Sequence, residues 1–367
     1  MIETRLQLCD NHCHFHPETT TDDAVKFATI LNKENANSPF CKYFFHLMTT
    51  QHIDIECLDV LLSRVDNKDI IVPYFGVHPW FSHLFYTGDT KPNKIDHYSK
   101  VLKPTPSDEL LSNLPEPMSI HQHTKRSMEI IEKHNLKVFG IGEIGLDKLF
   151  RVPDVGFLGN PKSNNIANDN GNKLPPPDKV LSKSRVTIQH QMDIFNHQLE
   201  FAQRMDKQVS IHCVKAHGAL FDEVMKYSST SSKNLQSTLT DSQATTSTSA
   251  SGLPPLRVIL HSYTGSIDQA KRWVKEWPKD GKLFFSLSNW INGSEDKEET
   301  LKGLMDIVSL EQILTESDVP VDRLFIEDKT QEYLDHLLGI YEKLNVYKLI
   351  ESDQIESNML SSINVQS

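Results

Sequence analysis

Two histidines near the start of the chain, His12 and His14, are the residues whose types and spacing most directly indicate chemistry. They follow a short apolar run at 6–9 and are separated by one residue. In a β-strand the side chains of residues i and i+2 point to the same side, so two imidazoles at this spacing can converge on one metal ion. Such pairs also occur on protein surfaces without a ligand, so the interpretation needs support from other parts of the chain.

Further polar residues stand at or just after the ends of other short apolar runs. These residues are His78, Glu143, His212, His261, Ser286, Ser288 and Asp318. One divalent ion could be held by His12, His14, Glu143 and Asp318, and a second by Glu143, His212 and His261, with Glu143 bridging the two. Two neighbouring ions stabilise the attacking and leaving oxygens of a hydrolytic displacement and lower the pKa of bound water. The residues therefore predict a hydrolase that needs no protein nucleophile.

Other polar residues near this predicted centre have weaker assignments. Asp147 competes with Asp318 as the closing carboxylate ligand, and we favour Asp318. His78 is predicted to face the substrate rather than a metal ion. Cations that come just after Glu143 and His212 could contact phosphate oxygens. They are Lys148, Arg151 and Lys215, with Arg185 a weaker candidate, and each could equally be a solvated surface charge.

The elements that must position these residues alternate along the chain. Apolar, β-rich runs lie at 6–9, 43–48, 70–75, 136–141, 208–211, 256–260, 282–287 and 312–314, and stretches with helical spacing lie between and after them at 22–32, 53–65, 124–135, 187–205, 216–227, 267–277, 297–308 and 331–344. This alternation predicts a (β/α)8 TIM-like barrel, whose active-site residues stand at the C-terminal ends of the strands. A doubly wound open sheet is the alternative. The barrel is favoured because its strand ends all meet at one mouth.

Three irregular stretches interrupt this alternation within a single predicted barrel, residues 1–350. Residues 81–118 and 151–183 follow the third and fourth strands, leave from the active-site face and could form a substrate wall. Residues 228–255 are Ser/Thr-rich, lie on the opposite face and are predicted to be disordered. Residues 351–367 are predicted to be a C-terminal tail.

Bulk composition bounds the class of protein. The 367 residues are 38% hydrophobic, which is enough for a substantial core, and five cysteines without a C-x-x-C pair suggest no disulfide framework. No long apolar run or export signal is visible, so we expect an intracellular protein, cytoplasmic or nuclear, without a membrane span. The net charge of −11 argues against a protein that coats nucleic acid.

Taken together, the motifs resemble those of the TatD-like metal-dependent deoxyribonucleases. The matching pieces, in family order, are Asp10-Asn11-His12-Cys13-His14, Gly76-Val77-His78-Pro79-Trp80, Gly142-Glu143-Ile144-Gly145-Leu146-Asp147, Ser210-Ile211-His212-Cys213, His261-Ser262-Tyr263-Thr264-Gly265-Ser266 and Leu314-Thr315-Glu316-Ser317-Asp318. Their spellings are most similar to a fungal branch of Cut9-interacting, Scn1-like proteins. The resemblance implies a TIM-like barrel, divalent Mg, Mn or Zn, and the metal roles given above. Asn11 and the long insertions depart from the family pattern.

We therefore predict a metal-dependent hydrolase that cleaves DNA phosphodiester bonds through a metal-activated water, acting as a 3′–5′ exonuclease or as an endonuclease. Asp318 is predicted to orient this water or take its proton, together with Glu143. Two alternatives stay open: hydrolysis of amide or ester bonds, which the same ligands can support, and binding of a protein partner in the cell-cycle machinery by a barrel that keeps its metal site.

Overall fold

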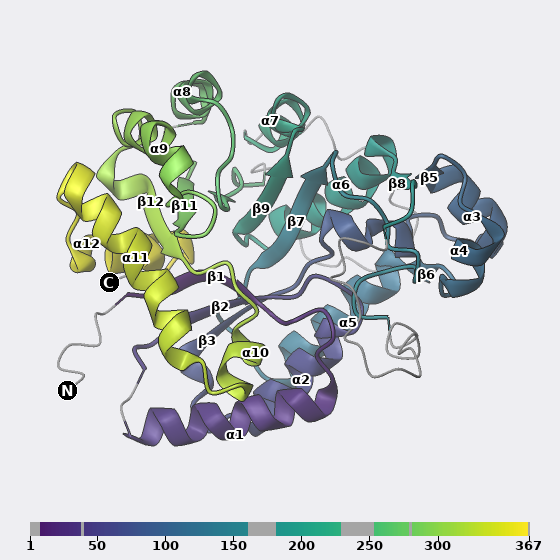
Figure 1. The fold of residues 1–367 in the computed structure, drawn as a ribbon, viewed down its shortest axis with the longest axis horizontal. Helices are drawn as coiled ribbons and strands as arrows, with labels where there is room; N and C mark the ends of the chain where they lie inside the picture. Colours follow the sequence, from purple (N-terminus) through teal and green to yellow (C-terminus); the bar gives the residue numbers. More distant parts are fainter. Residues whose placement is uncertain (1–7, 38–39, 161–180, 229–252, 279–280, 366–367) are drawn as a thin grey trace, which may run out of the picture.

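The predicted strands form one barrel-like ring. The structure is a computed structural model and describes residues 8–37, 40–160, 181–228, 253–278 and 281–365. The strands of the ring are β1 (Asp10–His14), β2 (Phe45–Met48), β3 (Ile71–Tyr74), β7 (Ile141–Asp147), β9 (Val209–Val214), β10 (Val258–Leu260), β11 (Leu283–Ser288) and β12 (Ile313–Glu316). All neighbouring pairs among them are parallel. The strands stand at the centre of the molecule with helices around them (Figure 1).

Hydrogen bonds join the two sheets of the ring at both seams. One sheet has the order β1-β2-β3 and the other β12-β11-β10-β9-β7. Where β3 meets β7, the amide of Phe75 donates to the carbonyl of Gly140 over 3.0 Å. Where β12 meets β1, the amide of Asp318 donates to the carbonyl of His12 over 2.9 Å. Because both seams are bridged, the arrangement is the predicted TIM-like barrel rather than an open sheet with two free edges.

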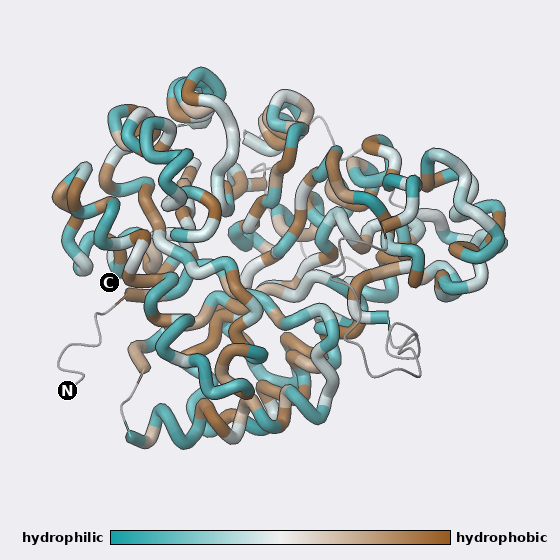
Figure 2. Tube along the Cα trace, in the orientation of Figure 1, coloured by the Kyte–Doolittle hydropathy of each residue, from teal (hydrophilic) through white to brown (hydrophobic). Residues whose placement is uncertain are grey.

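The helices cover the outside of the ring. They are α1 (Thr21–Asn37), α2 (Asp54–Arg64), α5 (Ile120–Lys133), α6 (Ile188–Arg204), α7 (His217–Val224), α8 (Ile267–Glu276), α9 (Glu298–Met305), α10 (Val321–Ile326) and α11 (Thr330–Lys348). Hydrophilic and hydrophobic residues alternate along them (Figure 2), as expected for helices that bury one face. Among the described helices, none is long and apolar enough to cross a membrane.

The first insertion is folded rather than irregular. It contains 3-10 helix η2 (Pro79–Leu84), β4 (Phe85–Tyr86), α3 (Lys94–Val101), β5 (Leu102–Lys103), α4 (Asp108–Asn113) and β6 (Met118–Ser119). The buried side chains of Phe81, Phe85, Tyr98 and Leu102 belong to a second hydrophobic cluster. Just after the second insertion, β8 (Arg185–Val186) pairs antiparallel with β5. Residues 161–180 of that insertion, and 229–252 of the Ser/Thr-rich stretch, lie outside the described residues.

The segment expected to be a C-terminal tail instead contains helix α12 (Ser352–Ser362). Ile355 and Met359, four residues apart, are fully or almost fully buried. The side-chain amide of Asn358 donates to the carbonyl of Ile313 over 2.7 Å, which ties α12 to the start of β12. Met359 packs with barrel residues such as Cys9 in a third hydrophobic cluster. The helix forms because this spacing gives it one apolar face to bury.

The strands also extend further toward the mouth than the apolar runs predict. β1 begins at Asp10, after the predicted strand has ended, and β7 begins at Ile141, the last residue of its predicted strand. His12, Glu143 and His212 therefore lie within strands rather than after them. The apolar pattern in the sequence ends before the strands do, because the mouth end of the barrel is lined by polar side chains that pair with one another.

Candidate metal centre at the mouth of the barrel

One buried carboxylate, that of Glu143, stands at the centre of four imidazoles. Its Oε1 lies 3.1 Å from His78 Nε2, 3.1 Å from His212 Nδ1 and 3.4 Å from His261 Nε2. Its Oε2 lies 3.3 Å from His12 Nε2. Burial alone would raise the pKa of Glu143, but the surrounding histidines hold it well below its usual range. The carboxylate is therefore ionised, with one oxygen facing His12 and the other facing the remaining rings.

A close approach of two strands places His212 against Glu143. Gly145 on β7 lies opposite His212 on β9 in the parallel register, and its φ is 149°. A Cβ atom at Gly145 would overlap the carbonyl oxygen of His212. The amide of Glu143 also donates to the carbonyl of Thr49 over 3.0 Å, which fixes the backbone of the carboxylate. Only glycine at position 145 allows β7 and β9 to approach this closely.

His12 is held with one nitrogen facing the centre. Its ring stacks on that of His261, with centroids 3.5 Å apart and 13° between planes. Its Nδ1 lies 2.9 Å from the hydroxyl oxygen of Ser210, which leaves Nε2 to face Glu143. Burial, followed by the charge of His261, lowers the pKa of His12 and keeps the ring neutral, the form that binds metal ions.

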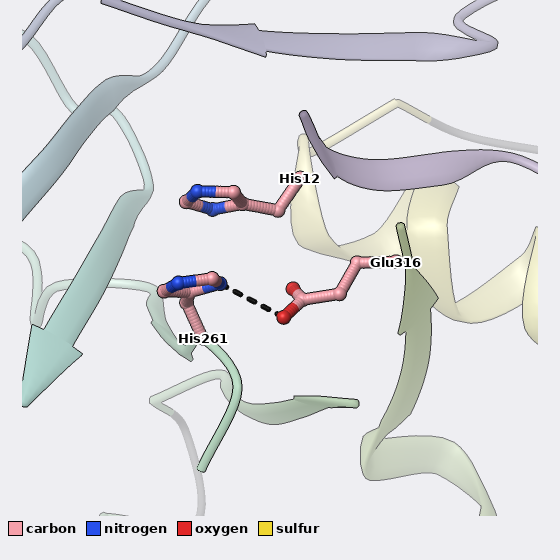
Figure 3. A group of neighbouring side chains, drawn as sticks. All are labelled: His12, His261 and Glu316. Carbon is pink, nitrogen blue, oxygen red and sulfur yellow. Dashed lines mark ion pairs between the residues drawn. The ribbon is translucent and has the colours of Figure 1, made fainter. Parts of the chain in front are cut away.

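Glu316 stands in the motif at the end of the eighth predicted strand, but the sequence assigned it no role in the site. Its Oε1 lies 2.8 Å from His261 Nδ1 (Figure 3). The same oxygen accepts hydrogen bonds from the amide and hydroxyl of Ser262. The contact with Glu316 engages Nδ1 and turns His261 Nε2 toward Glu143. Burial opposes the charge on His261, but the carboxylates of Glu316, Asp318 and Glu143 raise its pKa to about 10. Glu316 lies two residues after Leu314 on β12, so strand alternation could have placed it in the barrel interior.

Asp147 orients His212 in a similar way. Its Oδ2 lies 3.5 Å from His212 Nε2 and accepts a 2.7 Å hydrogen bond from the indole N–H of Trp80. The amide of Leu149 donates to Oδ1 over 2.6 Å. Burial opposes the charge on His212, but Asp147 and Glu143 raise its pKa to about 9. The amide of Phe150 also donates to Oδ1, so four neighbours contact the Asp147 oxygens and Asp147 acts as a positioning residue for His212.

His78 carries its proton on the nitrogen that faces Glu143. Its Nδ1 accepts a 3.1 Å hydrogen bond from the amide of Trp80, so Nδ1 is unprotonated. In the neutral ring the proton then sits on Nε2, which donates to Glu143 Oε1. Burial lowers the pKa of His78 to about 4, so the ring is neutral near pH 7. The role of His78 toward the substrate stays a prediction, and the structure also groups His78 with Glu143 and His212 as possible metal ligands.

Asp318 and His14 lie at the edge of this arrangement. Asp318 Oδ1 is 3.6 Å from His261 Nε2, and Oδ2 accepts a 3.1 Å hydrogen bond from the hydroxyl of Ser262. The Asp318 backbone is left-handed, with φ at 57°. His14 Nδ1 lies instead 2.9 Å from the carbonyl oxygen of Phe15. The prediction that His14 converges with His12 relies on the alternation of side chains in a regular strand. Strand β1 has a register shift between Asp10 and Cys13, so this alternation is interrupted there.

The donor set fits divalent ions. In the described residues, two groups of side chains bring ligand atoms within 4.8 Å of one another: His12, His261 and Glu316, and His78, Glu143 and His212. Two ligand atoms bound tetrahedrally at about 2.0–2.1 Å from one ion stand about 3.3 Å apart. The separations of 3.1–3.4 Å around Glu143 match this value. Imidazole and carboxylate ligands suit Zn and Mn, and Mg less well.

The predicted phosphate-binding cations lie beside the centre rather than in it. Lys148 and Lys215 line a cavity of about 750 Å³ that opens at the same end of the barrel. Arg151 is half-buried on the loop after β7 and is not among the residues that line this cavity. The guanidinium of Arg185 donates to the carbonyl of Lys148 over 3.0 Å and thus supports the loop that carries this lysine.

Fold and site together define a barrel of the metallohydrolase type, with a carboxylate–imidazole centre at the C-terminal ends of its parallel strands. The chain belongs to the TatD related DNase family, whose family model matches residues 9–362. An uncharacterized deoxyribonuclease of Saccharomyces cerevisiae is 32% identical over 329 residues, 86% of this chain and 84% of the relative. The Cut9-interacting protein Scn1 of Schizosaccharomyces pombe is 29% identical over 287 residues, 74% of this chain and 78% of the relative.

Solved structures share the fold. A TatD homologue from Escherichia coli has a TM-score of 0.50 at 16% identity, covering 98% of this chain and 99% of its own. A TatD-family hydrolase from Entamoeba histolytica has a TM-score of 0.51 at 12% identity, covering 97% of this chain and 99% of its own. The likeness therefore extends over nearly the whole barrel.

Proposed function

We propose that this protein hydrolyses phosphodiester bonds of DNA as a metal-dependent 3′–5′ exonuclease. The single observation that carries the proposal is the convergence of four imidazoles on the Glu143 carboxylate at the barrel mouth, in a chain of the TatD related DNase family. The ligands of two ions would be His12, His14, Glu143 and Asp318 for one, and Glu143, His212 and His261 for the other. When bound, such ions lower the pKa of water and neutralise charge on phosphoryl oxygens.

The side chains around the centre have separate roles in this proposal. Asp318, whose side chain is 17% exposed, would orient the attacking water or accept its proton. The Nε2–H of His78 would donate a hydrogen bond to a non-bridging phosphoryl oxygen. Lys148, Arg151 and Lys215 would contact phosphates of the substrate strand.

Exchange of Asp318 for asparagine tests this assignment. Asp318→Asn removes the proton acceptor but keeps a similar shape, so we expect kcat on bis(4-nitrophenyl) phosphate to fall by about 10²- to 10⁴-fold. Bound metal, measured by elemental analysis, should be reduced by much less. Glu327→Gln is the matched control, because Glu327 is exposed and pairs with Lys329 on the surface. Full activity of Asp318→Asn with metal bound would contradict the role.

Substrate and direction are tested with defined substrates. The protein should degrade end-labelled single-stranded DNA from a free 3′ hydroxyl, and a blocked 3′ end should protect the strand. Faster turnover of amide or ester substrates than of bis(4-nitrophenyl) phosphate would favour the alternative hydrolase chemistry.

A protein partner is a separate proposal that only the relatives support. One relative is named for its interaction with Cut9. A partner in the cell-cycle machinery would bind outside the metal centre, so Glu143→Gln should abolish hydrolysis and leave that binding intact.

A further inference from the structure

We infer that the cavity beside the metal centre seats the nucleotide next to the scissile phosphodiester of the substrate strand. The inference rests on the proposed function and deepens it. The cavity, about 750 Å³, is formed by the segments that follow β9, β10 and β11 and by α7, α8 and α9, which begin there. In Figure 1 these helices lie together along the upper side of the ring.

The charge of the cavity is opposite to that of the chain. Three lysines, Lys148, Lys215 and Lys297, line it, and none of its lining residues is an aspartate or glutamate. The whole chain carries a net charge of −11. Among the described residues, no carboxylate pairs with Lys148 or Lys215, whereas Lys297 lies 3.3 Å from the exposed Asp296. A cationic cavity in an acidic protein selects an anion, and phosphate is the anion that lysine clusters bind in nucleic-acid sites.

The cavity lies next to the metal centre along the chain, although its lining includes none of the residues of that centre. Lys215 comes three residues after His212, and Thr264 comes three residues after His261. The hydroxyl of Thr264 donates to the carbonyl of Cys213 over 3.0 Å, so the two segments form one floor. Three residues of extended chain span about 10 Å at most. A strand whose phosphodiester lies at Glu143 therefore places its next nucleotide over this floor.

The remaining wall is apolar and suits a base and sugar. Ile267, Ile291, Leu301 and Leu304 line the cavity together with the ring of Tyr263. A volume of this size lies within the range of about 300–1,000 Å³ that is usual for small-molecule sites. A free phosphate ion would need only the lysines. The combination of cations with apolar surface matches a nucleotide, which has both kinds of surface.

Two variants test the cavity without touching the metal ligands. A Cβ atom added at Gly218, in the first turn of α7, meets nothing within 4 Å, so Gly218→Leu places its side chain into open space beside the cavity without disturbing the backbone. Lys297→Ala removes one cation. Lys275→Ala, at the exposed end of α8 and outside the cavity, is the matched control. Thermal unfolding checks that each variant folds.

The variants are compared on a small and a long substrate. Bis(4-nitrophenyl) phosphate has no neighbouring nucleotide, so both cavity variants should hydrolyse it like the wild type. On a short oligothymidylate the KM should rise about tenfold for Lys297→Ala, and at least as much for Gly218→Leu. The salt dependence of oligothymidylate binding, measured by anisotropy in EDTA, should weaken for Lys297→Ala by about 0.7 in log–log slope. Lys275→Ala should change neither the KM for oligothymidylate nor the salt dependence of its binding.

The outcomes separate the two proposals. Wild-type KM and anisotropy in both cavity variants would overturn the nucleotide site, even where bis(4-nitrophenyl) phosphate is hydrolysed normally. Equal losses on both substrates would also overturn it, because the variants would then be affecting the metal centre. A wild-type protein that cleaves neither substrate would overturn the proposed function, and the anisotropy of the variants would still decide the cavity. If Gly218→Leu does not fold, Lys297→Ala alone decides.

Discussion

At the scale of single residues, the site is defined by how each imidazole is oriented. Ser210 engages His12, Glu316 engages His261, and the amide of Trp80 engages His78. In each case the partner takes up one ring nitrogen, so the other is left to face Glu143. For the proposed ligands His12 and His261, partners of this kind would hold the rings in place before an ion binds, which lowers the cost of binding.

Loss of the Glu316 carboxylate should therefore weaken metal binding through His261. Glu316 is fully buried and its Oε1 lies 2.8 Å from His261 Nδ1. Glu316→Gln keeps the volume but removes the charge, so we expect metal affinity to fall about 10- to 100-fold, the usual effect of losing such a partner. Competition with a chromophoric chelator measures this affinity. Glu311→Gln, an exposed change before β12, should leave it unchanged, and an unaltered affinity in Glu316→Gln would contradict the role.

At the scale of elements, apolar periodicity predicts helices and strand order better than it predicts where elements end. The alternation at α2 and α6 is clear because each buries one continuous apolar face. The folded first insertion is not predictable this way, because its short strands β4 and β6 depend on pairing between residues more than thirty positions apart. The sequence of α12 contains an i, i+4 apolar pair, Ile355 and Met359, that favours a helix. Where this helix packs depends on barrel residues that are distant in the sequence, such as Cys9.

Helix α12 should contribute to stability through Met359. This side chain is 1% exposed and packs at the end of the barrel opposite the metal centre. Met359→Ala leaves a cavity there and should lower the free energy of unfolding by about 2–5 kcal/mol, as buried methionine truncations do. Urea unfolding measures the change. Val346→Ala on α11, where the valine is 76% exposed, should cost little, and an equal effect of the two changes would contradict the packing of α12.

Helices α2 and α5 should be linked by a charge that depends on pH. Asp59 on α2 contacts Arg126, Lys133 and His134 over 2.9, 2.7 and 2.6 Å. Partial burial would raise the pKa of Asp59, but these groups lower it below its usual value. A carboxyl group whose pKa falls on folding stabilises the native state above its unfolded pKa, and this stabilisation is lost as the pH falls through the folded pKa.

Asp59→Asn should thus lower the free energy of unfolding by about 1–2 kcal/mol at neutral pH, since it leaves Arg126 and Lys133 without this carboxylate. The difference from the wild type should shrink below about pH 4, where the unfolded Asp59 becomes protonated. Urea unfolding at several pH values measures it. Asp69→Asn, whose side chain is 68% exposed, should show no such dependence, and a constant cost of Asp59→Asn at all pH values would contradict the charge linkage.

At the scale of the whole molecule, the sequence allows the barrel and most of its mouth to be predicted from one regularity. His12, Glu143 and His212 come from different strands, and parallel strands in a barrel bring their C-terminal ends to one place. What could not be predicted are the contacts that orient the rings. Glu316 and His261 are distant in sequence, and only the folded ring shows that their side chains meet.

Because the centre joins β1, β7, β9 and the end of β10, a bound ion should stabilise the whole barrel. Binding to the native state alone adds about 2.7 kcal/mol at a free-ion concentration 100 times Kd. We therefore expect the melting temperature of metal-free protein to rise with added Mn or Zn and to fall again with EDTA, measured by calorimetry. The variant with both His212→Ala and His261→Ala should lose most of the rise. An unchanged melting temperature at saturating metal would mean that the ion does not connect these strands, because linkage requires any ligand of the native state alone to raise its stability.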